Sequence, residues 1–163
     1  MAPPICVQGA IGQIAEAEKG VHAYPPEVDA RTERGDTPLL CAAASRSPGT
    51  LEVLGVLLDQ GAAPDATAAV EGRCALHALA VQGHTQSMAL LLRAGATAQV
   101  ATSRFGSTPL HHAVEGGHSG AVALWLNAGV DPAHREQLGR RALDIARKGG
   151  KLELVALLEG ATS

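Results

Sequence analysis

Seven histidines and three cysteines are the residues of this 163-residue chain whose types could support metal binding or nucleophilic chemistry. Such chemistry needs side chains that converge at close spacing. Cys6, Cys41 and Cys74 form no CxxC pair and no other metal-ligand spacing, so we expect reduced thiols that pack as small apolar groups. His111 and His112 are adjacent, and on a helix their side chains would diverge by about 100°, away from any shared ion.

The remaining candidates for catalysis are equally weak. The chain contains no GxSxG elbow, no HExxH pair and no GxxxxGK[ST] phosphate loop. Glu16 and Glu18 fall on a helix that we expect to be solvated, and His22 and His134 fall in loops with no ligand partner in sight. We therefore predict no enzymatic activity, no catalytic residue, no metal, no cofactor and no small-molecule substrate.

Short paired helices must position these side chains. Residues 105–132 read FGSTPLHHAVEGGHSGAVALWLNAGVDP, in which Thr108 and Pro109 form a helix start with a capping hydroxyl and a preset φ. Two glycines at 116–117 break this helix, and a second helix runs from near His118 to Gly129. Each helix has about two turns, whereas an isolated helix needs roughly 12–15 residues to persist in water. Such a unit has to pack against copies of itself.

Three copies of this unit are present. The matched leucines Leu39, Leu76, Leu110 and Leu143 lie 37, 34 and 33 residues apart, and the longer first interval reflects extra residues in connections, about three at 45–48 and one near the next turn. The motif TPLH at the helix start, Gly-His between the helices and Ala-Gly after the second helix resemble the ankyrin repeat, a unit of about 33 residues.

The resemblance to the ankyrin-repeat family implies an all-α solenoid of helix–loop–helix repeats with β-hairpin or loop fingers. We expect one domain over 1–163, with a degenerate N-terminal cap at about 5–30 and repeats at about 31–66, 70–100, 104–134 and 138–163. In the family, imidazoles at the positions of His77 and His111 tie finger and helix backbones together. His84 and His118 also occupy family positions, so we expect structural roles for all four, and core packing for Trp125.

Ankyrin-like proteins bind other proteins through a concave face of fingers and inner helices, so the resemblance implies a protein–protein interaction module, an adaptor, inhibitor or assembly chaperone. Phe105 is the central candidate, as an exposed aromatic beside Arg104; the alternative is packing onto the neighbouring hairpin. The predicted contact residues flank the finger glycines or lie on the inner helices: Glu33, Arg34, Asp36, Glu71, Arg73, Val81, Gln82, Arg104, Phe105, Ser107, Glu115, Leu138, Arg140 and Lys148.

The charge distribution suggests what the partner carries. A net charge of −3 argues against a general nucleic-acid binder. Basic residues nevertheless gather towards the C-terminus, which predicts a partner segment that is acidic near repeats three and four. The alternative is a regulator or effector that acts on a nuclear, chromatin-bound or host partner through these basic repeats. The cluster comprises Arg135, Arg140, Arg141, Arg147 and Lys148.

Two further expectations concern location and stability. Neither a signal-like segment nor a bilayer-spanning apolar run is found, so we expect a monomer in the cytoplasm, with the nucleus possible and no membrane contact. Repeats two and four replace Thr-Pro with Cys74-Ala75 and Arg141-Ala142. Each replacement loses a capping oxygen worth about 0.5–2 kcal/mol, so these two helix starts should fray first.

Overall fold

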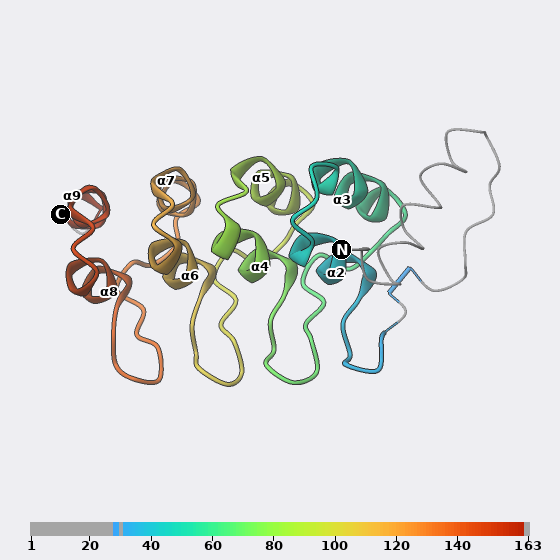
Figure 1. The fold of residues 1–163 in the computed structure, drawn as a ribbon, viewed down its shortest axis with the longest axis horizontal. Helices are drawn as coiled ribbons and strands as arrows, with labels where there is room; N and C mark the ends of the chain where they lie inside the picture. The colour runs from blue at the N-terminus through green and yellow to red at the C-terminus, as the bar shows by residue number, and fades with distance from the viewer. Residues whose placement is uncertain (1–27, 30, 162–163) are drawn as a thin grey trace.

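The computed structural model describes residues 28–29 and 31–161, and within them eight helices form four pairs in a row (Figure 1). Helices of the inner row contact one another in order, and so do those of the outer row. The predicted cap lies outside the described residues apart from 28–29. The inner row consists of α2 (Pro38–Ala44), α4 (Ala75–Gln82), α6 (Pro109–Gly116) and α8 (Ala142–Lys148). The outer row consists of α3 (Thr50–Asp59), α5 (Thr85–Arg93), α7 (Ser119–Asn127) and α9 (Leu152–Gly160).

A loop that we call a finger precedes each inner helix, and all four fingers project from the same side of the helices (Figure 1). Finger one is 32–36, finger two 68–73, finger three 102–107 and finger four 136–140. In each, the first residue donates its backbone N–H to the carbonyl of the last, over 2.7–3.1 Å. A glycine with positive φ, such as Gly106 at 64°, makes the turn. The described fingers contain no strand, and one isolated bridge, between Arg135 and Arg141, flanks finger four, so the fingers are loops.

The unequal repeat lengths follow from these connections. Residues 45–49 join α2 to α3, whereas only 83–84 join α4 to α5, which accounts for three extra residues in the first interval. Fingers two and three are each one residue longer than finger four, which explains why the second interval also exceeds the third. The extra residues thus lie at the surface and leave the helix packing in register.

Small apolar side chains form the core between the two helix rows. The four matched leucines are 1%, 0%, 1% and 8% exposed, as the stacking argument requires. Trp125 on α7 is fully buried, which confirms its predicted role in packing. Cys41 and Cys74 are also buried, and burial raises the pKa of the Cys74 thiol, so this thiol stays protonated. Both agree with packed thiols, whereas Cys6 lies outside the described residues.

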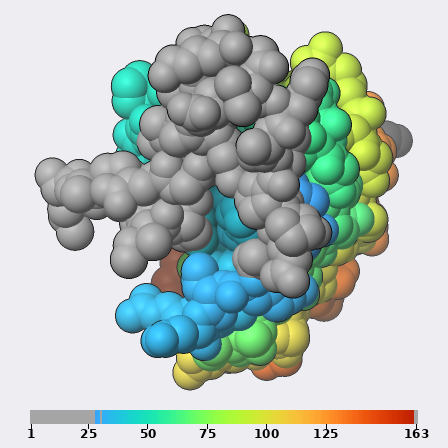
Figure 2. All heavy atoms as spheres, turned by 90° about the vertical axis from the view of Figure 1, so that its right-hand side faces the viewer, coloured from blue at the N-terminus to red at the C-terminus, as the bar shows by residue number. Residues whose placement is uncertain are grey.

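Polar bonds with a repeat-length offset connect each pair to the next. After each of the first three outer helices, the residue that follows the turn donates its backbone N–H to a side-chain oxygen in the preceding repeat. These bonds join Ala63 to Asp29 (3.2 Å), Thr97 to Asp65 (2.8 Å) and Asp131 to Gln99 (3.2 Å). The regular offset fixes the position of one repeat on the next and therefore the alignment of the fingers. Seen along the row, fingers of successive repeats follow one another along the lower edge (Figure 2).

Candidate partner-binding surface

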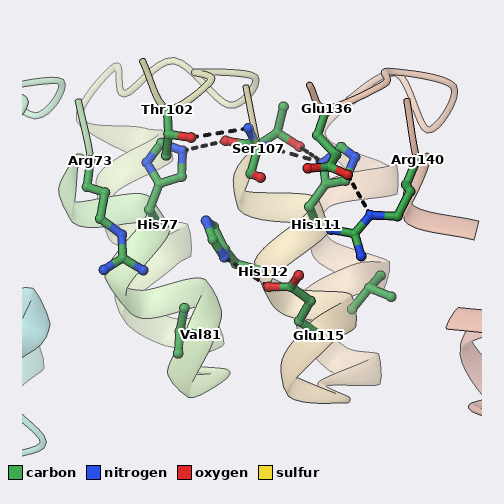
Figure 3. A network of polar contacts seen from close by, with 12 residues as sticks. Arg73, His77, Val81, Thr102, Ser107, His111, His112, Glu115, Glu136 and Arg140 are labelled. Atoms are coloured by element: carbon green, nitrogen blue, oxygen red, sulfur yellow. Dashed lines mark hydrogen bonds and ion pairs between the residues drawn. The ribbon is translucent and has the colours of Figure 1, made fainter. Parts of the chain in front are cut away.

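The surface where α4 and α6 lie side by side carries five polar and apolar side chains that the fold brings together (Figure 3). Arg73 comes from the end of finger two, Val81 from the last turn of α4, His112 and Glu115 from α6, and Arg140 from the end of finger four. We call these five residues the inner-helix face. Val81 is 37% exposed, a large share for an apolar side chain next to a packed core. Four of the five were predicted from the sequence, and His112 was not.

His112 lies at the centre of the inner-helix face. Its ring meets that of His77 edge-on with centroids 5.6 Å apart, and its Nδ1 is 3.4 Å from the Glu115 carboxylate (Figure 3). Burial lowers the pKa of His112, and the Glu115 carboxylate partly opposes this effect. The spacing of three residues to Glu115 on a helix was the available signal, because such residues share one helix face.

His77 ties α4 to finger three. Its Nδ1 accepts the backbone N–H of Cys74 over 3.2 Å, and its Nε2 donates to the Ser107 carbonyl over 3.2 Å. The side chain is fully buried, and this burial lowers its pKa to about 4, so the ring is neutral at pH 7. The structural role that the family resemblance implied is confirmed at this position.

His111 occupies the equivalent position on α6. Its Nδ1 accepts both the backbone N–H (3.3 Å) and the hydroxyl (2.8 Å) of Thr108. Its Nε2 is buried and makes no hydrogen bond of ordinary geometry. Burial lowers the pKa of His111, and the nearby Arg140 carbonyl partly opposes this effect. His134 packs edge-on against this ring at 5.8 Å and donates from Nε2 to the Gly106 carbonyl over 3.1 Å. The loop histidine thus links finger three to the next repeat, a role that the sequence did not reveal.

The fingers carry further exposed members of the predicted set. Phe105 is 46% exposed, with the Arg104 guanidinium 5.0 Å from its ring centroid. Its backbone carbonyl, rather than its ring, joins the neighbouring finger by accepting the N–H of Gln137 over 2.9 Å. Leu138 is 73% exposed on finger four. Glu33 and Arg34 on finger one are exposed, and Asp36 is half-buried.

Two other predicted contact residues serve the scaffold. The Ser107 backbone accepts from His77 and donates to the Thr102 hydroxyl over 3.2 Å. Gln82 donates from Nε2 to the Ala43 carbonyl over 3.0 Å, which ties α4 to α2. Their side chains are half-buried. Flanking a turn glycine or ending an inner helix is therefore not enough to make a residue available to a partner.

The C-terminal basic cluster is more nearly neutral than a count of cations suggested. Arg140 pairs with the buried Glu136 carboxylate at 2.6 Å, Arg141 with Asp144 at 3.1 Å and Arg147 with Glu159 at 2.6 Å. Hydrogen bonds from the partner arginines lower the pKa of Glu136 and hold that of Asp144 at about 2. Arg135 donates to the Gly139 carbonyl over 2.6 Å, and Lys148 is exposed at the end of α8. Intramolecular carboxylates thus neutralise three of the five cations.

Helix pairs, glycine-turned fingers and imidazole ties are the features that the family resemblance implied. A model of the ankyrin repeat family matches residues 34–69, 71–102 and 105–136, more than half of the chain. The chain belongs to this family. Ankyrin repeats are generally protein–protein interaction modules. No curated protein matches the sequence.

The fourth ankyrin helix pair lies beyond the matched residues, and the structure shows it as α8 and α9 packed on α6 and α7. Asp144 stands where repeats two and three have His77 and His111. Among residues 28–29 and 31–161, no group of three or more histidine, cysteine or acidic side chains is placed to hold a metal ion. No helix in that part of the chain is both long and apolar enough to cross a bilayer.

Proposed function

We propose that this ankyrin-repeat chain binds another protein through its fingers and its inner-helix face, and acts as an adaptor, an inhibitor or an assembly chaperone rather than as an enzyme. The observation that carries the proposal is that the fingers and the inner-helix face expose large apolar side chains outside the packed core. Val81, Phe105 and Leu138 are exposed apolar groups beside the charged Glu115 and Arg104. Apolar anchors with a charged rim are the composition expected of a protein interface.

An acidic partner segment near repeats three and four is the finer part of this proposal. Arg135 and Lys148 are the members of the basic cluster that remain for it, because carboxylates within the chain pair with Arg140, Arg141 and Arg147. Arg104 adds to them in part, since it shares the Glu71 carboxylate with Arg73. Binding should therefore weaken from low to moderate salt, but only modestly, since exposed charges are screened over about 10 Å. Affinity that is unchanged across the salt series would remove the acidic requirement and leave the apolar one.

The test compares two exposed faces of the same molecule. Val81→Asp places a charge on the inner-helix face, and Leu152→Asp places the same charge at an 80% exposed site on α9. Proximity labelling and capture with each variant should lose partners with the first and keep them with the second. Equal capture by both variants, each confirmed as folded by circular dichroism, would move the interface away from this surface.

The alternative function is a regulator or effector of a nuclear, chromatin-bound or host partner that uses the basic C-terminal repeats. Lys148 and Arg135 support it, because both are exposed. A mobility-shift assay with duplex DNA at low salt would test directly whether the chain binds chromatin DNA. We expect no shift, because Arg140, Arg141 and Arg147 are paired with carboxylates within the chain.

We expect a monomer that works in the cytoplasm. Multi-angle light scattering tests the oligomeric state, and imaging of a tagged chain tests the location.

A further inference from the structure

Four exposed residues occupy one equivalent position on the four inner helices. Each stands five residues after the matched leucine of its repeat, at or next to the last residue of the helix, and we call them the inner row: Ala44, Val81, Glu115 and Lys148. Neighbouring inner helices pack on one another, and Val81 and Glu115 lie at the same level of α4 and α6 (Figure 3). Along the stack the row therefore changes from two apolar residues to an acidic one and then a basic one.

Two hydrogen bonds of the same kind show that this position is structurally equivalent in consecutive repeats. His118 donates from Nε2 to the Val81 carbonyl over 2.9 Å. One repeat later, Lys151 donates from Nζ to the Glu115 carbonyl over 2.5 Å. Both donors meet the backbone of the row, so they leave its side chains at the surface, where Val81 and Glu115 are both exposed.

The Glu115 carboxylate has no cationic partner within the described chain at neutral pH. Its side chain is 49% exposed, and its close partner is the Nδ1 of His112 at 3.4 Å. Burial lowers the pKa of His112 below its ordinary 6.5, so this ring is neutral at pH 7. Arg140 is near enough to interact with Glu115, but it pairs with the Glu136 carboxylate at 2.6 Å.

His112 is poorly placed to supply the missing charge. A carboxylate only accepts hydrogen bonds, so the neutral ring carries its proton on Nδ1, which faces Glu115. The Nε2 of His112 is buried without a hydrogen-bond partner. A second proton would therefore create an unpaired buried N–H, close to the His77 ring and to the Arg73 cation. Glu115 thus keeps an uncompensated negative charge next to the apolar Val81.

Lys148 is the corresponding uncompensated cation on α8. It is exposed, and no carboxylate among residues 28–29 and 31–161 pairs with it, Glu115 included. Its neighbour Arg147 differs, since it pairs with Glu159 at 2.6 Å. A cation opposite Glu115 and an anion opposite Lys148 would each complete a charge pair that the chain itself leaves unmade.

We propose that the inner row selects a partner segment by the order of its side chains, with an apolar side chain on Val81, a cation on Glu115 and an anion on Lys148. The proposal rests on the proposed function and specifies what the inner-helix face and the end of α8 recognise. A segment with the two charges in the opposite order would place like charges against both residues, which lowers affinity. The acidic part of the partner therefore lies at repeat four, and a basic residue separates it from the apolar contact.

Panning a phage-displayed library of random linear peptides tests the order of charges. Glu115→Lys combined with Lys148→Glu exchanges the two charges and keeps the net charge of the chain. Wild type should enrich peptides in which a basic residue stands between an apolar and an acidic one. The exchanged variant should enrich peptides in which an acidic residue stands between an apolar and a basic one. The same consensus from both proteins, or no enrichment on wild type, would overturn the proposal.

Affinities of one enriched peptide then locate the site. Fluorescence anisotropy should show that the peptide selected on wild type binds the exchanged variant at least about tenfold more weakly. The control exchanges Asp59→Lys and Arg93→Glu, two exposed charges at the ends of the outer helices α3 and α5, and should leave the affinity unchanged. Circular dichroism confirms that both variants are folded. Equal weakening by both exchanges would show a general charge effect and would overturn the site.

Two further outcomes separate this proposal from the proposed function. If a partner protein is lost with Val81→Asp but binds wild type and the exchanged variant equally, the proposed function stands and the order of charges fails. If neither change affects its binding, both fail. A wild-type dimer that the exchange dissociates, measured by light scattering, would make a second copy the occupant and would also overturn the proposal.

Discussion

The middle inner helices and the last one make the same connection with different chemistry. At the third residue of each helix, His77, His111 or Asp144 accepts the backbone N–H of the residue before the helix, over 3.2, 3.3 and 2.9 Å. In α4 and α6 the acceptor is a buried neutral imidazole. In α8 it is a half-exposed carboxylate that also pairs with the Arg141 side chain. The backbone geometry is therefore what the fold requires, and the chemical group depends on burial.

A second connection shows the same substitution. His118 donates to the Val81 carbonyl over 2.9 Å, and Lys151, at the equivalent place one repeat later, donates to the Val114 and Glu115 carbonyls over 2.7 and 2.5 Å. These carbonyls end the preceding inner helix, where no intrahelical donor is available. Imidazoles connect the middle of the stack, and a carboxylate and an ammonium group connect its last repeat.

The largest effect should come from removing the buried imidazole. His77→Ala leaves a cavity, leaves the Cys74 N–H without its acceptor and removes one of the two hydrogen bonds to the Ser107 carbonyl, so we expect a loss of about 2–4 kcal/mol in the free energy of unfolding. Urea denaturation followed by circular dichroism measures it. His84→Ala, at an exposed imidazole, is the control and should change stability by less than about 0.5 kcal/mol. A loss below about 1 kcal/mol for His77→Ala would show that the connection to finger three contributes little.

Acid should weaken the middle of the stack before the end. Burial lowers the pKa of His77 to about 4, below its ordinary 6.5, and lowers those of His111 and His112 in the same direction. Between about pH 6.5 and about pH 4 the unfolded chain therefore binds more protons at these histidines than the folded chain does. The stability that the neutral histidines contribute is complete above about pH 6.5 and is lost as the pH falls towards about 4. We expect the free energy of unfolding to drop by on the order of 1–2 kcal/mol between about pH 7 and about pH 5.

The contrast with α8 sharpens this prediction. Its Asp144 carboxyl, held at a pKa of about 2 by Arg141, contributes stability that is lost only as pH falls below about 4. Asp144→Asn should therefore leave the slope between about pH 7 and about pH 5 unchanged. Denaturation curves at several pH values for both proteins check the point, and a flat wild-type profile over this range would contradict it.

Asp144→Ala should have an intermediate effect. It leaves the Arg141 N–H without its acceptor and frees the arginine side chain, which is half-exposed. The loss resembles that of a helix cap, about 0.5–2 kcal/mol. Asp144→Asn keeps an acceptor and should cost less than Asp144→Ala in the same urea titration.

The expectation that the starts of α4 and α8 fray first stays a prediction. Amide exchange at Leu76, Leu110 and Leu143 would test it, with Leu110 on α6 as the reference.

The repeat pattern made most of this fold predictable, and the site only in part. Leucines that recur every 33 to 37 residues and glycines at the turns are local signals, and they located the helix pairs and the fingers. Local signals also placed Phe105 and Leu138 at the tips. Val70, which is 72% exposed, was missed because the residues directly beside the glycine of finger two are Glu71 and Arg73, and Val70 stands one place farther from that glycine.

What the sequence could not show is which charges are already used within the chain. Arg140 and Arg147 looked like members of a basic patch, but Glu136 and Glu159 reach them, the latter from α9. Charge counts ignore such pairing because it depends on where the next helix lies. The roles of His112 and His134 have the same origin, since each involves a group in another repeat or on another turn of the chain.

The smallest effect tests whether the two chemistries are interchangeable. Lys151→Met removes the donor at the end of α6 and should cost about 0.5–1 kcal/mol, since the bond to the Glu115 carbonyl is exposed and water can replace it. Lys151→His installs the imidazole that repeat three already uses at this place. If the geometry of the connection matters more than its charge, the histidine variant should lie within about 0.5 kcal/mol of wild type in urea denaturation. A histidine variant as weak as the methionine variant would instead show that the last repeat needs a cation near the carbonyl end of α6, where a positive charge meets the negative end of the helix dipole.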